Sequence, residues 1–163
     1  MPRPFRIFAR HQEVAPRFGL RADVTSGDDD PNDPDLQTFN PLFPKGTYFG
    51  EASLIGPLNH MDLHPSVGLR LSERLDATLD WDLFWRESRS DGLYRVSGTP
   101  QVPGAGSRAR SVGSQASLTM EYELERHTTL TAAYAHFFAG AFLEESGVGR
   151  DVDFLALWLA YRI

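Results

Sequence analysis

The final twelve residues alternate between two kinds of side chain, and this pattern constrains the fold more than any other stretch of the chain. Reading back from Ile163, every second residue is large and mainly apolar as far as Leu155, whereas Trp158 and Arg162 lie among the intervening residues. A period of two places the first set on one face of a β-strand. Such an ending is typical of the last strand of a membrane β-barrel, although the last strand of a soluble α/β core also forms a nearly continuous apolar run.

Five further segments show the same alternation. They are residues 17–25, 61–72, 75–86, 112–124 and 128–138. In the third of them, for example, Leu79 and Trp81 alternate with Asp80 and Asp82. Segments of roughly ten residues have the length that a tilted strand needs to cross a bilayer. The sequence therefore predicts six strands, each with one apolar and one polar face.

The connections between these segments alternate in length. The tight turns are residues 72–75 and 125–128, and the long polar connections are residues 26–60, 88–113 and 140–151. We therefore predict an all-β fold, an antiparallel up-and-down transmembrane β-barrel with short periplasmic turns and long extracellular loops. Because single-chain outer-membrane barrels have at least about eight strands, six strands would form an incomplete, open barrel. We expect residues 15–163 to be the C-terminal part of a barrel, and residues 1–14 to be a non-barrel or poorly ordered segment.

Composition narrows the functional classes. The chain has 163 residues, no cysteine and a formal charge of −6, so a general nucleic-acid binder, which needs a basic surface, is not expected. No apolar run approaches the roughly 20 residues of a membrane helix. The basic segment Met1–Arg10 lacks the apolar core of a signal peptide. Together with the six strands, this indicates either the C-terminal part of a larger exported barrel or a truncated or fusion-derived open reading frame.

Several motifs resemble the C-terminal portion of the alginate export family. The most specific is the loop SGDDDPNDPDLQTFNPLFP (residues 26–44), followed later by YAHFFAG (134–140) and by the closing AYRI (160–163). The resemblance covers residues 16–163. It implies a large bacterial outer-membrane barrel of the porin or channel type, which lets an anionic, alginate-like polysaccharide or a related solute cross passively. The implied partners are outer-membrane lipid and lipopolysaccharide, the barrel-assembly machinery and the solute. One departure is the terminal Ile163, where such barrels usually end in Phe.

The resemblance also implies basic side chains in the pore, in place of the counterions of an anionic sugar chain. By strand parity, the basic residues on the polar faces are Arg17, Arg21, Arg70, Arg86 and Arg162. The guanidinium group suits carboxylates because it binds them in a bidentate manner. The alternative is a structural network with acidic residues on the same faces, namely Asp23, Asp62, Asp76, Asp80, Asp82, Glu121 and Glu123.

The acidic loop after the first strand suggests a Ca²⁺ site. Asp28, Asp29, Asp30 and Asp33 supply hard oxygen ligands at close spacing. The loop does not match the EF-hand pattern, and its prolines also suit a plain solvated loop. No other cofactor is expected.

The segment Tyr48–Gly56 is amphipathic enough for one or two helical turns, and a short helix there could fold into the barrel mouth. We expect no enzyme activity. The chain has no G-x-S-x-G elbow, and His60 and His64 would lie about 13 Å apart along a strand, too far for one metal. The remaining alternative is a soluble or surface β-sandwich binding module, which would be soluble without detergent.

Overall fold

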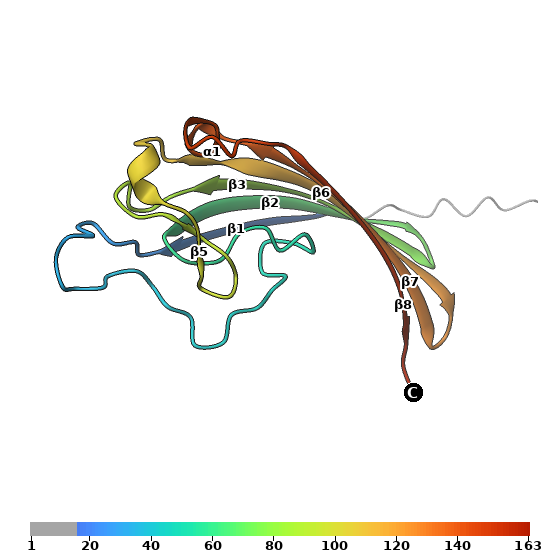
Figure 1. The fold of residues 1–163 in the computed structure, drawn as a ribbon. Coiled ribbons are helices and arrows are strands. Elements are labelled where there is room, and N and C mark those ends of the chain that lie inside the picture. The colour runs from blue at the N-terminus through green and yellow to red at the C-terminus, as the bar shows by residue number, and fades with distance from the viewer. Residues whose placement is uncertain (1–15) are drawn as a thin grey trace, which may run out of the picture.

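The computed structural model describes residues 16–163, and the segment predicted for residues 1–14 lies outside the described residues. Six long strands dominate it. They are β1 (Arg17–Thr25), β2 (His60–Ser72), β3 (Leu75–Trp85), β6 (Ser111–Glu125), β7 (Thr128–Ala139) and β8 (Val152–Tyr161). Figure 1 shows them as one strongly curved layer. The all-β fold is thereby confirmed.

The strands follow one another in chain order. The sheet order is β1-β2-β3-β6-β7-β8, and every neighbouring pair is antiparallel. Within the described residues, β1 and β8 each have a partner strand on one side alone, so the sheet is open. The six long strands therefore form a single layer, not the two packed sheets of the alternative β-sandwich.

The two ends of the sheet differ in their connections. We call the end with the tight turns at residues 73–74 and 126–127 the turn end, and the opposite end, which carries the three long connections, the loop end. The long connections hold elements that the alternation did not predict. These are the strands β4 (Leu93–Tyr94) and β5 (Pro100–Val102), a 3-10 turn, η1 (Gly104–Gly106), and the short helix α1 (Ala141–Glu145).

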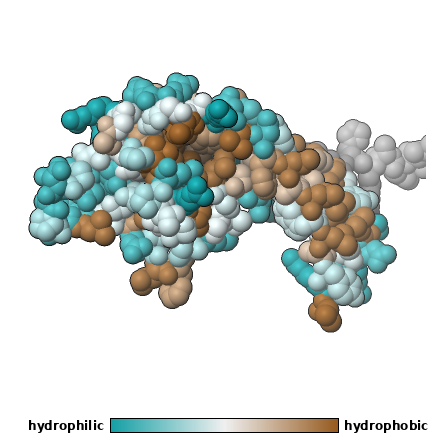
Figure 2. Space-filling model, viewed as in Figure 1, coloured by the Kyte–Doolittle hydropathy of each residue, from teal (hydrophilic) through white to brown (hydrophobic). Residues whose placement is uncertain are grey.

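The convex face of the sheet is apolar and exposed. Leu20 and Leu157, on the two edge strands, are 72% and 69% exposed, and Trp81 on a central strand is 46% exposed. In Figure 2 hydrophobic residues follow the strands, and hydrophilic residues dominate the loops. A compact sandwich would have buried Trp81 and Leu157, so their exposure agrees with the predicted open sheet.

The buried core lies on the concave side at the loop end. There the long connections fold back beneath the sheet (Figure 1). The buried apolar residues that form it are Phe49, Ile55, Phe84, Leu93, Val102, Val112, Phe137, Phe142 and Leu143. Phe49 packs edge-on against Phe84 with ring centroids 5.8 Å apart, and Phe84 stacks on Phe137 at 6.3 Å. These aromatic contacts join the first long connection to two strands of the sheet.

The helix expected within Tyr48–Gly56 is absent. Successive turns occupy this segment, with backbone hydrogen bonds from Gly50 to Thr47 and from Ser53 to Gly50. The positive φ angles of Gly50 (113°) and Ser53 (50°) are incompatible with a right-handed helix. The segment nevertheless folds against the concave side, where Phe49 is buried.

In the part of the chain that the structure describes, no helix is long and apolar enough to cross a membrane.

Candidate functional site

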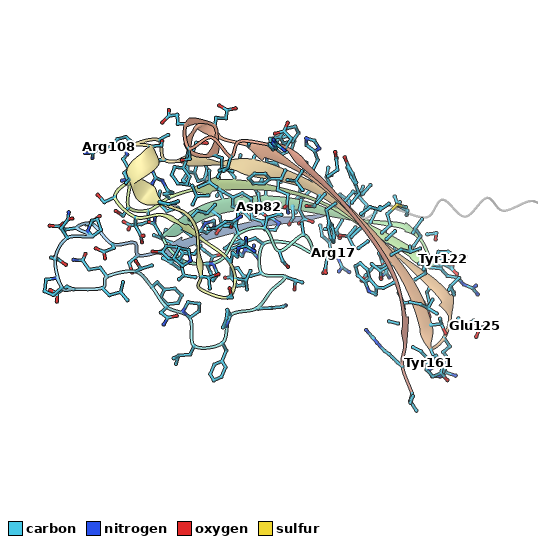
Figure 3. All side chains as sticks on the ribbon, in the orientation of Figure 1. Arg17, Asp82, Arg108, Tyr122, Glu125 and Tyr161 are labelled. Atoms are coloured by element: carbon cyan, nitrogen blue, oxygen red, sulfur yellow. The ribbon has the colours of Figure 1, made fainter. Side chains whose placement is uncertain are left out.

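The concave face carries the polar residues that alternate with the apolar ones. From the middle of the sheet to the turn end its members include Arg17, Arg21, Asp23, His64, Arg70, Asp76, Asp80, Asp82, Ser117, Thr119 and Glu121. Figure 3 shows Arg17 and Asp82 on this side and Tyr122 on the opposite side. Strand parity therefore assigns the faces of the regular strands correctly.

Arg21 is held in a cluster between β1 and the first long connection. Its Nε lies 3.2 Å from Oδ2 of Asp23, and its Nη2 donates to the Tyr48 carbonyl at 3.3 Å. The guanidinium also lies 5.0 Å from the centre of the Tyr48 ring, and the Tyr48 hydroxyl donates to Asp23 at 3.2 Å. Burial and the nearby carboxylate raise the pKa of Tyr48. Arg21 therefore links the first long connection to β1 at the edge of the sheet.

His64 lies between two aspartates of the neighbouring strand. Its Nε2 is 2.8 Å from Oδ1 of Asp80, and its Nδ1 is 2.7 Å from Oδ1 of Asp82. The Nη2 of Arg21 also approaches Nδ1, at 2.8 Å. The middle of the concave face thus holds a polar network in which His64 contacts Asp80, Asp82 and Arg21.

Arg70 and Arg17 lie nearer the turn end. Arg70 forms a bidentate pair with Asp76, with N–O distances of 3.0 and 3.3 Å. Both arginines line a cleft of about 380 Å³ that also includes Asp76 and Glu121. Arg162 lies just beyond the end of β8 and is exposed. Arg17, Arg70 and Arg162 are therefore accessible, and their role toward a solute stays a prediction.

Arg86 differs from the other predicted pore residues because its side chain is completely buried. The guanidinium donates to the carbonyls of Asp91 (2.8 Å), Ser107 (2.8 Å) and Ala109 (2.6 Å). It also lies 3.8 Å from the centre of the Phe142 ring. Burial lowers the pKa of Arg86. β3 ends at Trp85, after a register shift at Phe84 and Trp85. Arg86 therefore lies beyond the strand, where it organises the second long connection.

Carboxylates of the acidic loop accept hydrogen bonds from backbone N–H groups of the same loop. Oδ1 of Asp28 accepts the Asp30 N–H, Oδ1 of Asp30 accepts the Asn32 N–H, and Oδ1 of Asp33 accepts the Asp35 N–H. Asp29 lines a cleft between this loop and the second long connection. Across residues 16–163, no three histidine or acidic side chains converge in a way that could hold a metal ion. The geometry adds no support for the predicted Ca²⁺ site.

Sequence patterns missed a cavity beneath the first long connection. It has a volume of about 110 Å³ and lies where the turn at Gly50 and Glu51 covers the concave faces of β2, β3, β6, β7 and β8. Polar side chains of Glu51, His64, Asp80, Asp82, Ser117 and Thr119 line it, with Phe154 on one side. Alternation predicts the strand residues of this wall, but not the turn that closes it.

Comparison with known proteins agrees with the resemblance seen in the motifs. A family model described as alginate export matches residues 8–155, most of the chain. A search of curated proteins found no match. Alginate export points to polysaccharide transport at the bacterial outer membrane, and thus to a transport family and not an enzyme family. The match and the open all-β sheet together show that this chain belongs to the alginate export family.

Proposed function

We propose that this chain forms a section of the wall of an outer-membrane β-barrel that lets a polysaccharide or a related solute cross passively. The observation that carries the proposal is the division of one curved sheet into an apolar convex face and a polar concave face. In a barrel these would face lipid and a wet lumen respectively. Additional strands would have to pair with β1 and β8, because hydrocarbon does not tolerate open sheet edges.

The aromatic residues of the convex face support this orientation. Tyr122 and Tyr161 lie near the turn end, whereas the stacked rings of Trp81 and Phe138 lie nearer the loop end. Asp153 accepts a hydrogen bond from Tyr134 at 2.6 Å. It would mark the border of the apolar band toward the loop end. The eight residue-to-residue steps from Asp153 to Tyr161 span about 26 Å along the strand. At a tilt of about 40° this is roughly 20 Å of membrane depth, near the ~25 Å apolar band of such barrels.

The partners follow from these faces. Lipid and lipopolysaccharide would cover the convex face, with the turns in the periplasm and the long connections outside the cell. Assembly would depend on the barrel-assembly machinery. Arg17, Arg70 and Arg162 are the arginines that remain open to a passing solute, whereas Arg21 and Arg86 hold loops.

A pair of arginine substitutions on β8 tests the proposal. Leu157→Arg places a charge on the convex face, and Ala160→Arg places the same charge on the concave face of the same strand; both sites are exposed. If the convex face meets lipid, Leu157→Arg should destabilise the inserted protein by about 2–4 kcal/mol, as at a bilayer midplane. Ala160→Arg should change the stability of the inserted protein little.

The measurement is urea-induced unfolding from lipid vesicles, followed by tryptophan fluorescence and by heat-dependent gel mobility. Equal effects of the two substitutions, or a monodisperse and cooperatively melting protein in plain buffer, would contradict the membrane assignment.

A further inference from the structure

A second pocket, distinct from the cavity at Gly50, lies at the loop end where the three long connections meet. Its volume is about 200 Å³. Its floor belongs to the buried core and consists of Ile55, Leu93, Val102, Phe137 and Leu143, none of which is more than 8% exposed. Because these side chains are already packed within the core, the apolar floor is preformed and does not depend on a ligand to assemble it.

The third long connection forms one wall of this pocket through the end of α1. There the Val148 N–H donates to the Leu143 carbonyl at 3.0 Å, and the Gly147 N–H donates to the Glu144 carbonyl at 3.0 Å. Gly147 has a φ of 77°, which glycine adopts without strain. These two bonds form a Schellman motif, in which the residue after the glycine contacts the last helical turn. Val148 is thereby placed near Leu143, and both side chains line the pocket.

The rim of the pocket is polar and basic. It contains Gln101 and Arg150, and both residues are exposed. Among the described residues that line the pocket, Arg150 alone is charged. The carboxylate of the adjacent Asp151 accepts a hydrogen bond from the Ala139 N–H at 2.9 Å. A guanidinium at the edge of an apolar pocket suits a carboxylate, which it binds in a bidentate manner.

The size and chemistry of the pocket restrict its ligand. An apolar cavity of about 150 Å³ in another protein binds benzene, so this pocket has room for one six-membered ring. The hydroxyl groups of a sugar would find no hydrogen-bond partner on the apolar floor, and their desolvation would oppose binding. An apolar ring, in contrast, gains from burial against Phe137 and Leu143. A carboxylate on that ring would lie at the rim beside Arg150.

We infer that this pocket binds a small carboxylate with one apolar ring, of the benzoate or cyclohexanecarboxylate class. The ring lies on the apolar floor and the carboxylate pairs with Arg150. This ligand is a second solute class, beyond the polysaccharide of the proposed function. The pocket shares no residue with the cleft that Arg17 and Arg70 line, so its ligand does not compete with an anionic polymer for those arginines.

The test is isothermal titration of the detergent-solubilised chain with benzoate, cyclohexanecarboxylate and the uncharged isostere benzamide. A detergent with a rigid steroid tail is used because that tail is too large for the pocket, and titration of protein-free micelles corrects for partitioning. We expect both carboxylates to bind with a dissociation constant of roughly 1 mM, and benzamide to bind roughly fivefold more weakly or less. No binding of either carboxylate, or equal binding of benzamide, would overturn the inference.

Two substitutions at exposed positions locate the binding site. Arg150→Gln should weaken benzoate about tenfold and change benzamide less than about twofold, because it removes the charge alone. Val148→Phe should abolish binding of both by filling the pocket. Arg108→Gln, at an exposed arginine of the loop end that lines a different cleft, is the control and should change affinity less than about twofold. Equal losses from the two arginine variants, or unchanged binding in Val148→Phe, would contradict the assigned site.

This inference and the proposed function can fail separately. Benzoate binding is measured in detergent and does not depend on insertion, whereas the Leu157→Arg and Ala160→Arg pair reports on lipid contact. Arg150→Gln should leave unfolding from vesicles unchanged, since Arg150 lies in a connection outside the strands. A chain that binds benzoate but responds equally to the two β8 substitutions would retain the pocket and lose the membrane assignment.

Discussion

The loop end and the turn end of the same sheet are stabilised in different ways. At the loop end the concave face is covered by the long connections, and Phe84, Phe137 and Arg86 are buried. At the turn end both faces are open, and Tyr122 and Tyr161 are 40% and 69% exposed. The loop end therefore contains its own core. The turn end has little apolar burial within the described residues and would gain it from lipid and from neighbouring strands.

The substitution with the largest expected effect on this difference in stability is Arg86→Met. The substitution leaves the carbonyls of Asp91, Ser107 and Ala109 without their donor. We expect a loss of about 3–5 kcal/mol in the free energy of unfolding, since a buried, hydrogen-bonded charge is removed. Urea-induced unfolding measures this loss, and limited proteolysis should show cleavage within residues 88–110. Arg74→Met, at the exposed turn end, is the control; a comparable loss there would remove the distinction between the two ends.

A smaller effect is expected at Asn59, which links the first two long connections. Its amide donates to the carbonyls of Ser88 (3.1 Å) and Gly92 (2.9 Å), and its Oδ1 accepts the Ser88 N–H at 2.6 Å. Asn59→Gly keeps the positive φ of 49° accessible but removes these bonds, at a cost of about 2 kcal/mol. Hydrogen exchange of the Ser88 amide should accelerate, while amides at the turn end keep their rates. Uniform acceleration along the sheet would instead indicate one cooperative unit.

The smallest effect is a pH dependence confined to the loop end. Burial and a 2.6 Å hydrogen bond to Asp91 raise the pKa of Tyr94 to about 12 from a usual value of 10.0. Because the folded pKa is raised, the stabilisation is fully present below pH 10 and is lost as the pH rises through about 12. Ultraviolet absorbance of tyrosinate during an alkaline titration measures this step, which Tyr94→Phe should remove. An unchanged titration in that variant would assign the step to another tyrosine.

Sequence patterns predicted the sheet much better than the loops. Side chains in a strand alternate with an exact period, so the faces of Leu79, Trp81 and Asp82 could be read from the sequence. The two tight turns were equally clear. These predictions depend on local geometry alone, and for this reason they agree with the structure.

The elements that the sequence did not predict depend on contacts between distant segments. The β4–β5 pair and the Arg86 network require the second long connection to fold beneath the sheet. The expected helix near Tyr48 is replaced by turns, and Gln115, 66 residues away along the chain, donates a hydrogen bond to the Phe49 carbonyl within them. The cavity shares this origin, since Glu51 lines it together with Asp80 and Thr119 of distant strands.

The unequal connections also set an order for folding. A two-residue turn joins β2 to β3 and another joins β6 to β7, whereas 34 residues separate β1 from β2. Closing the longer loop costs roughly 2.5 kcal/mol more in chain entropy, at about 0.6 kcal/mol for each of four doublings in length. The two turn-linked hairpins should therefore form first and serve as independent nuclei. The edge strand β1 would join late, when the connection that covers the cavity docks onto an existing sheet.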